Sequence, residues 1–330
     1  MEEEIVPESC KKARIEETMV KVAVKWNNTM YNFELDDTDD IQILRYMIYR
    51  ETNVRQDRQK ILNLKGKGGI KITESSKIIE LDIKEGKCLM MVGSREEDIA
   101  SIVLKPDEMD EVLNDFDEPD QESESYEKKE VYLAKIRRRI KDYKIEEFNK
   151  PRPGKKLLVL DIDYTLFDHR SSAENGHELM RPYLHEFLTS AYEHYDIVIW
   201  SATSMKWIIE KMKLLGVHNN ENYKILFYLD YNAMITVHYD KRVVEVKPLM
   251  VIWGKYQEWS SKNTIMFDDI RRNFLMNPKC GLRIAPFRNC HLNRAKDKEL
   301  LKLATYLKKI AENCDDFNKL NHRKWESYQP

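Results

Sequence analysis

Three apolar segments in the second half of the chain are each followed by polar side chains that could do chemistry. Asp161 and Asp163 follow residues 157–160, Ser201 follows residues 197–200, and Asp268 and Asp269 follow residues 264–267. If these segments are parallel strands of one sheet, their carboxyl ends gather four carboxylates and a hydroxyl into a small volume. Buried carboxylates repel one another, and a hard divalent cation relieves that repulsion. Magnesium is the usual cation with oxygen ligands beside phosphate.

The pattern Asp-x-Asp also occurs in calcium-binding loops and in ordinary turns. An EF-hand is disfavoured here, because the sixth loop position is Leu166 instead of glycine and the residues before Asp161 have the pattern of a strand. The order of Asp161, Asp163 and Thr165, then Ser201, Lys247 and the pair Asp268-Asp269, is much more specific than the first pair alone.

The elements that must position these side chains alternate between apolar strands and amphipathic helices. This pattern predicts an α/β domain with a parallel sheet, and helices over residues 179–192, 205–215 and 296–311. Residues 225–246 predict a β-rich insertion that forms one wall of a cleft. Too few residues separate Asp163 from Ser201 for a large cap domain, so we expect an open cleft, which favours a protein substrate over a small metabolite.

The first hundred residues predict a second, smaller domain. Residues 19–26 alternate as a half-buried strand, Asn27-Asn28 is a turn signal, and a helix should begin after Asp39 or Asp40. A short strand over residues 60–64 and a last strand over residues 88–92 complete the β-grasp order, which resembles ubiquitin. Lys60 and Leu62 should face outward as a docking surface, while Ile61 should point into the core.

Composition limits the other possibilities. The chain has 330 residues, a net charge of −2 and 34% charged residues, so global charge does not favour nucleic-acid binding. We find no apolar stretch of membrane-spanning length, and expect neither a nucleic-acid nor a membrane partner. Five scattered cysteines suit a reducing compartment better than a disulfide framework.

The expected domain borders follow from changes in charge along the chain. Residues 1–18 predict a flexible tail, 19–95 the ubiquitin-like docking domain, 96–126 an acidic linker, and 127–330 the catalytic domain with its core at 151–312. The linker contains ten acidic residues between Asp107 and Glu124 and no lysine or arginine there. A helix with a Leu133–Ile136–Ile140 stripe follows, and its basic run 135–139 is expected to be a solvated face.

The constellation resembles the haloacid dehalogenase superfamily of aspartate-nucleophile phosphatases. The similarity is closest to the branch that dephosphorylates the carboxy-terminal domain of RNA polymerase II, through residues 157–166, 181–183, 199–202, 246–249 and 267–269. With the first domain included, residues 19–325 resemble the members of that branch that carry a ubiquitin-like domain. The resemblance implies a nuclear enzyme that docks on the proteasome regulatory particle and dephosphorylates phosphoserine or phosphothreonine in it.

Phosphoryl-transfer chemistry assigns roles within this resemblance. Asp161 is the expected nucleophile, which forms an aspartyl-phosphate, and Asp163 is the expected general acid and base. Ser201 should donate a hydrogen bond to a phosphoryl oxygen, and Lys247 should neutralise developing charge.

The resemblance also implies the metal ligands. Magnesium would be held by the Asp161 side chain, the backbone carbonyl of Asp163 and the Asp269 side chain. Asp268 would be a neighbour or an alternative ligand. Thr165 should either hold the loop or have a direct role in the site, and both remain open.

Two other functions fit the same residues. A small-molecule phosphatase of the same superfamily would turn over metabolites and would not need the first domain. A scaffold with a phosphatase fold would bind without catalysis, although every expected catalytic side chain is present.

Overall fold

The computed structural model describes residues 19–84, 86–93, 95, 126, 129–171, 176–239 and 242–330. The chain divides into two compact units, residues 1–109 and 110–330, and the border falls inside the predicted linker. The predicted tail, all of the linker except Tyr126, and the turn residues Asp240 and Lys241 lie outside the described residues. No helix among the described residues is both long and apolar enough to cross a membrane.

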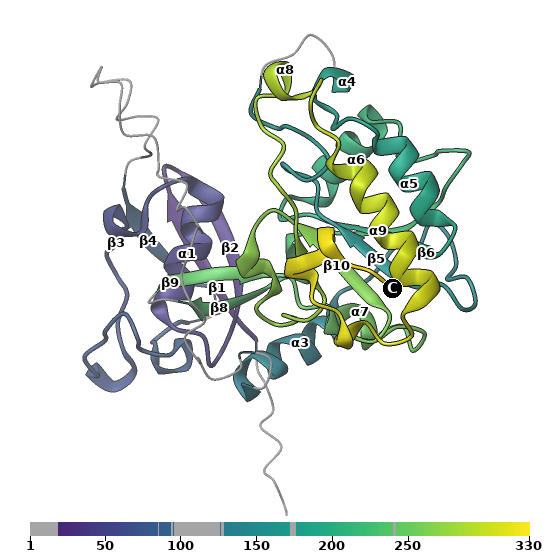
Figure 1. Cartoon of the computed structure of the whole chain (residues 1–330). Coiled ribbons are helices and arrows are strands. Elements are labelled where there is room, and N and C mark those ends of the chain that lie inside the picture. Colours follow the sequence, from purple (N-terminus) through teal and green to yellow (C-terminus); the bar gives the residue numbers. More distant parts are fainter. Residues whose placement is uncertain are drawn as a thin grey trace, which may run out of the picture. The chain divides into compact units, whose positions relative to one another are not determined.

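Unit 1 has the predicted β-grasp arrangement (Figure 1). Its four-stranded sheet has the order β2-β1-β4-β3, with β1 and β4 parallel at the centre. The elements are β1 (Met19–Trp26), β2 (Thr29–Asp36), α1 (Ile41–Thr52), β3 (Lys60–Ile61) and β4 (Cys88–Val92). Asn27 and Asn28 both have positive φ, which gives the tight turn of the β1–β2 hairpin. The Asp40 side chain accepts a hydrogen bond from the Ile43 N–H and caps α1, as predicted.

The third strand of unit 1 is shorter than the sequence predicts. Only Lys60 and Ile61 form β3. The strand ends there because the Asn63 side chain replaces the backbone in the pairing with β4: it accepts from the Met90 N–H and donates to the Cys88 carbonyl. Ile61 is half-buried between the exposed Lys60 and Leu62, which agrees with the predicted alternation, although it is not a fully buried core residue. Gln59 is the buried residue of this segment, and its amide donates to the carbonyls of Arg45 and Val54.

Unit 2 is built on a parallel sheet of five strands in the order β11-β10-β5-β6-β7. These strands are β5 (Lys156–Leu160), β6 (Tyr195–Trp200), β7 (Ile225–Leu229), β10 (Thr264–Asp268) and β11 (Gly281–Arg283). From β5 the chain first adds β6 and β7 on one side and later adds β10 and β11 on the other. The strand order therefore reverses beside β5, where α/β sheets of this kind bind ligands.

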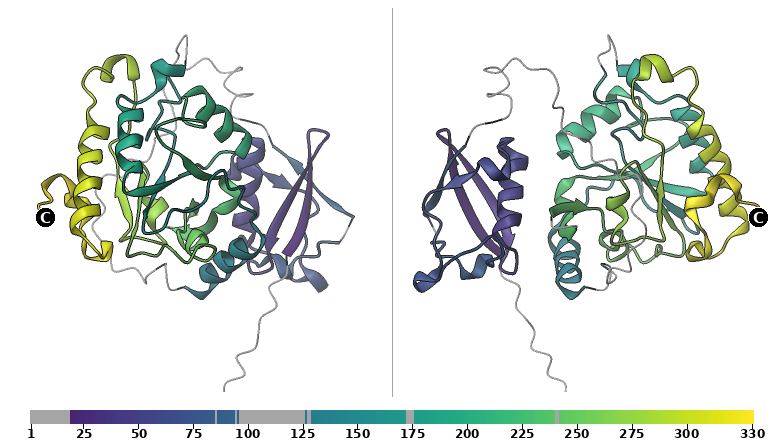
Figure 2. Two further views of the ribbon diagram at one scale, coloured as in Figure 1. Left: turned by 90° about the vertical axis from the view of Figure 1, so that its right-hand side faces the viewer. Right: turned by 60° about the vertical axis from the view of Figure 1, so that its left-hand side comes forward.

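Helices cover both faces of this sheet (Figure 2). On one face, α5 (Leu184–Tyr192), α6 (Met205–Leu214) and α9 (Glu299–Asn313) pack on alternate sheet residues such as Leu158 and Ile199. On the other face lie α3 (Glu130–Asp142), α7 (Met250–Trp253) and the hairpin of β8 (Ile235–Tyr239) and β9 (Arg242–Val246). Two short helices, α4 (Gly176–Leu179) and α8 (Cys290–Asn293), flank the loops at one end.

Short 3₁₀ helices lie between or after the main elements of both units. They span Gln56–Arg58, Lys67–Gly69, Ile78–Glu80, Tyr231–Ala233, Arg271–Phe274, Phe317–Lys319 and His322–Ser327.

Two predicted elements of unit 2 have different bounds. The predicted helix over 179–192 is wrong in its first turn, because Pro182 disfavours helical geometry at Arg181 and Tyr183 has a φ of 64°. The helix starts only at Leu184. The predicted insertion over 225–246 is also too long, because β7 is a strand of the central sheet and only β8 and β9 form the hairpin.

The basic run of α3 is not the solvated face that the sequence predicts. Lys135 and Arg138 are buried, at 6% and 7% exposure. The Lys135 ammonium donates to the Thr236 hydroxyl and carbonyl, and the Arg139 guanidinium donates to the Met234 carbonyl. The β8–β9 hairpin covers this side of α3, and a helical periodicity argument contains no information about such a cover.

Candidate active site

The first two aspartates are presented by a tight loop after the central strand β5. The Asp161 N–H donates to the Phe267 carbonyl of β10, which continues the sheet pairing to the last residue. The Ile162 carbonyl then accepts hydrogen bonds from three N–H groups, those of residues 165, 166 and 167. Tyr164 adopts a φ of 61° within this turn. The loop therefore fixes Asp161 and Asp163 at the carboxyl end of the sheet.

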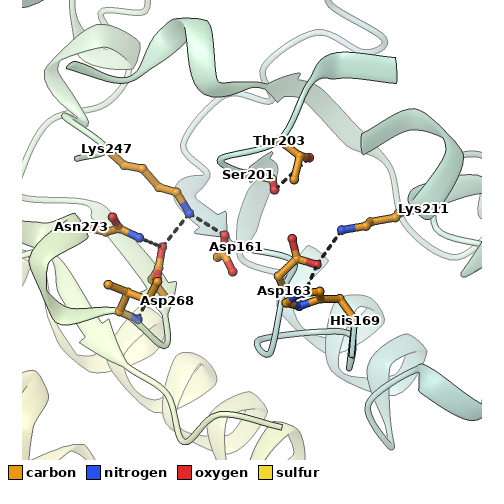
Figure 3. Close-up of polar contacts among 10 residues, drawn as sticks. Asp161, Asp163, His169, Ser201, Thr203, Lys211, Lys247, Asp268 and Asn273 are labelled. Carbon is orange, nitrogen blue, oxygen red and sulfur yellow. Dashed lines mark hydrogen bonds and ion pairs between the residues drawn. The ribbon is translucent and has the colours of Figure 1, made fainter. Parts of the chain in front are cut away.

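Lys247 bridges two carboxylates of the predicted set, those of Asp161 and Asp268 (Figure 3). Its ammonium lies 2.6 Å from Asp161 Oδ1 and 2.6 Å from Asp268 Oδ2. Lys247 is fully buried where β9 ends, and its N–H donates to the Asn273 carbonyl. Side chains that are 86 and 21 residues away in sequence thus meet at one lysine.

The pKa shifts of the residues in this cluster indicate an excess of negative over positive charge. Burial raises the pKa of Asp161 well above its ordinary value, although the Lys247 ammonium opposes the rise. Burial alone would lower the pKa of Lys247, but the two carboxylates outweigh it and raise that pKa. Burial and the neighbouring Asp268 raise the pKa of Asp269 to about 6. Three ionised carboxylates and one ammonium would leave a net charge of −2 in a buried site.

The three carboxylates of residues 161, 268 and 269 fit a divalent cation. Their oxygens lie within 4.8 Å of one another, and oxygen ligands are those that magnesium prefers. Both carboxylate oxygens of Asp268 already accept hydrogen bonds. Oδ1 accepts from the Ile270 N–H at 2.9 Å, and Oδ2 accepts from Lys247 at 2.6 Å and from Asn273 at 2.7 Å. No side-chain partner of this kind holds the Asp269 carboxylate among the described residues. Asp269 is thus better placed than Asp268 to bind a cation.

Asp163 faces a separate set of partners. The Lys211 ammonium of α6 lies 2.6 Å from Asp163 Oδ1, and His169 Nδ1 lies 3.9 Å from the same oxygen (Figure 3). Lys211 was missed by the sequence analysis. It belongs to no recognisable motif, and the only signal was a lysine on the helix that follows Ser201.

Ser201 lies at the end of β6, as predicted, and Thr165 lies in the loop after β5. The Ser201 hydroxyl is 3.3 Å from the Thr203 hydroxyl. Thr165 is fully buried, and its hydroxyl has no hydrogen-bond partner among the described residues. Within the described part of the chain, the Thr165 side chain makes no hydrogen bond that holds the loop. The Thr165 carbonyl does hold it, by accepting from Arg181 at 3.1 Å.

The predicted docking residues of unit 1 lie on an exposed patch. Lys60 pairs with Val92 across the β3–β4 ladder, and the Leu62 N–H donates to the Met90 carbonyl at 2.8 Å. Leu62, Met90 and Val92 are 55%, 42% and 56% exposed. The sequence analysis found Lys60 and Leu62 but missed the two β4 residues, although their alternation with buried Leu89 and Met91 was a usable signal.

The parallel sheet, the paired aspartates after its central strand and the buried lysine define a phosphatase of the haloacid dehalogenase type. A family profile described as "NLI interacting factor-like phosphatase" matches residues 156–318. A Drosophila melanogaster protein named ubiquitin-like domain-containing CTD phosphatase 1 is 63% identical over 312 residues, which cover 94% of this chain and 97% of that protein. The human protein of that name is 58% identical over 311 residues, with 93% and 96% covered.

These similarities extend over both units. The chain belongs to the family of ubiquitin-like domain-containing CTD phosphatases, and it is a protein phosphatase. A solved structure of "Fcp1, an essential RNA polymerase II CTD phosphatase" shares 12% identity and a TM-score of 0.34, covering 55% of this chain and 65% of that one.

Proposed function

We propose that the chain is a magnesium-dependent protein serine/threonine phosphatase that works through an aspartyl-phosphate on Asp161. The observation that carries this proposal is the buried cluster of Asp161, Asp268, Asp269 and Lys247. When all four groups are ionised, its net charge of −2 is the charge that one divalent cation balances. The sheet edge presents the nucleophile Asp161 within that cluster, whereas Asp163, the acid and base group, contacts Lys211 and His169 instead.

Each side chain has a distinct task in this mechanism. Asp161 attacks the phosphorus atom, the serine or threonine oxygen leaves, and Asp163 supplies the proton that this oxygen needs. Ser201 donates to a phosphoryl oxygen, and Lys247 stabilises the charge that develops on the transferred group. Magnesium, held by Asp161, Asp269 and the Asp163 carbonyl, would screen the repulsion between the nucleophile and the phosphate.

Asp163 must first carry the proton that it delivers to the leaving oxygen. Its carboxylate is ion-paired with Lys211 at 2.6 Å. Uptake of a proton by Asp163 would weaken this ion pair and free the carboxyl group for the leaving oxygen, and until then Lys211 fixes the orientation of Asp163. In the second half of the reaction, Asp163 accepts a proton from the water that hydrolyses the aspartyl-phosphate.

Unit 1 would direct the enzyme to its substrate. The patch of Lys60, Leu62, Met90 and Val92 combines exposed apolar area with a positive charge, which suits protein docking. The partner we propose is the proteasome regulatory particle, which the enzyme dephosphorylates and regulates in the nucleus. Because the relatives are named CTD phosphatases, a phosphorylated polymerase tail is a further substrate to test.

The direct test is hydrolysis by the full chain of phosphoserine peptides, intact phosphorylated proteasome and a panel of phosphorylated metabolites. Magnesium-dependent release of phosphate from the proteins, abolished by EDTA, supports the proposal. Preferred turnover of metabolites would support the small-molecule alternative. Binding of phosphoproteins without any turnover would support the scaffold alternative.

A further inference from the structure

A cavity of about 340 Å³ lies in unit 2 between the 285–288 segment and the start of α9. Its lining carries five cationic side chains, Arg181, Arg288, Lys296, Lys298 and Lys302, and the two carboxylates Asp297 and Glu299. We call this cavity the basic pocket. Its lining carries a surplus of three positive charges when all these groups are ionised, although the whole chain has a net charge of −2.

Several of these cations are not neutralised inside the protein. Arg181 is held by Asp297 at 2.9 Å, and Lys302 by Glu326 at 3.2 Å. In contrast, neither Lys296 nor Lys298 forms an ion pair within the described part of the chain. Burial also raises the pKa of Glu299, which weakens the negative charge in the pocket.

Arg288 contributes an unused donor to the same lining. Its Nε is buried and has no hydrogen-bond partner among the described residues. A buried guanidinium N–H without an acceptor is costly. Arg288 belongs to the pocket lining, and a side-chain movement that turns this N–H toward the pocket would let a bound anion accept from it.

The pocket shares a wall with the catalytic loop. The Phe287 N–H donates to the Tyr164 carbonyl at 2.7 Å, and the Arg288 guanidinium lies 4.5 Å from the centre of the Tyr164 ring. Arg181 donates to the Thr165 carbonyl from the same lining. A peptide seated at Asp161 would therefore pass close to the pocket.

We propose that the basic pocket binds a second phosphoryl group, carried by another phosphorylated residue of the same substrate chain. This inference rests on the proposed function, because it requires a phosphoprotein substrate. A phosphorylated side chain carries about −1.5 to −2 charges at neutral pH and three acceptor oxygens. It matches the unpaired ammoniums and the free guanidinium donor better than a single carboxylate does. The enzyme would then prefer multiply phosphorylated segments over singly phosphorylated ones.

The test compares peptides that carry one phosphoserine with peptides that carry a second one at each of several distances on either side. Binding is measured on the full-length Asp161→Asn protein, which retains the pocket but should not turn the peptides over. We expect at least one spacing to bind roughly tenfold more tightly than the singly phosphorylated peptide, because phosphate contacts to cations are charge-assisted. Glutamate in the second position should recover only a small part of this gain.

The gain should depend on two exposed lysines of the pocket. Adding Lys296→Gln and Lys298→Gln should remove most of it and leave the affinity for the singly phosphorylated peptide nearly unchanged. The matched control adds Lys308→Gln and Lys319→Gln, which remove the same charge from exposed positions outside the pocket, and should preserve the gain.

The outcomes separate this inference from the proposed function. No gain at any spacing, or a gain that survives the Lys296 and Lys298 changes, would overturn the second phosphate site. A gain as large with glutamate would assign the pocket to carboxylates instead. Failure of the proposed function has a different signature, because the wild-type enzyme would then not hydrolyse even the singly phosphorylated peptide.

Discussion

Replacing the buried lysine of the active site is a sharp test of the electrostatic account. Lys247→Met keeps most of the side-chain volume but removes the ammonium between Asp161 and Asp268. Three carboxylates would then remain in the cluster with no cation among them. Removal of one member of a buried ion pair costs about 3–5 kcal/mol, because the remaining charge is left uncompensated. We therefore expect the free energy of unfolding of unit 2 to fall by about this amount in EDTA at pH 8.

The pH dependence of this loss has a definite sign. The pKa of Asp269 is already raised to about 6 in the wild type, and burial raises the pKa of Asp161. A carboxyl whose pKa is raised by folding binds more protons in the folded than in the unfolded protein, so stability falls as the pH rises. Loss of Lys247 removes the group that opposes this rise. The difference between variant and wild type should be largest at pH 8 and shrink by pH 5.

Urea unfolding followed by tryptophan fluorescence measures this difference. Five of the six tryptophans lie in residues 110–330, so the signal reports mainly on unit 2. Lys308→Met, which removes an exposed charge from α9, is the control and should leave stability nearly unchanged at both pH values. Equal stability of Lys247→Met and wild type at pH 8, or a difference that grows on acidification, would refute the reasoning.

Four other predictions concern catalysis, the metal and docking. Asp161→Asn should lower kcat at least about a thousandfold, or ~4 kcal/mol of barrier, with little change in stability; more than a tenth of wild-type activity would exclude Asp161 as the nucleophile. Asp269→Asn should weaken magnesium activation more than Asp268→Asn, and equal titration midpoints would contradict that order. Lys211→Met should slow phosphoserine hydrolysis more than aryl phosphate hydrolysis, since only the serine oxygen needs a proton from Asp163; equal slowing would exclude the positioning role. Lys60→Glu should reduce proteasome capture and leave hydrolysis of a small ester unchanged, and undiminished capture would move the docking surface elsewhere.

The sequence predicted those features that depend on local pattern. The fold of unit 1 could be predicted from the alternation of residues 19–26 and the helix cap at Asp40. The fold of unit 2, and the sheet edge that carries the site, could be predicted from the apolar runs before Asp161, Ser201 and Asp268. Each of these signals lies within a few consecutive residues, so no tertiary information was needed to recognise it.

The failures come from contacts between distant segments. Lys211 meets Asp163 across 48 residues, and no local spacing encodes that meeting. The helical pattern places Lys135 on the solvent-facing side of α3, but the β8–β9 hairpin covers it and Thr236 accepts its hydrogen bond. Ile61 alternates correctly with its neighbours, but Gln59 takes the buried position through hydrogen bonds to two backbone carbonyls.

The central claim is that phosphate passes through a covalent bond to Asp161, and one measurement tests it directly. The full chain is mixed with a phosphoserine peptide and magnesium, quenched in acid within a turnover, digested and analysed by mass spectrometry. The account predicts a transient phosphoryl group on Asp161 that hydroxylamine removes, as expected for an acyl phosphate, and none on Asp163. A phosphoryl group on any other residue, or turnover in which no phosphorylated enzyme forms, would contradict it.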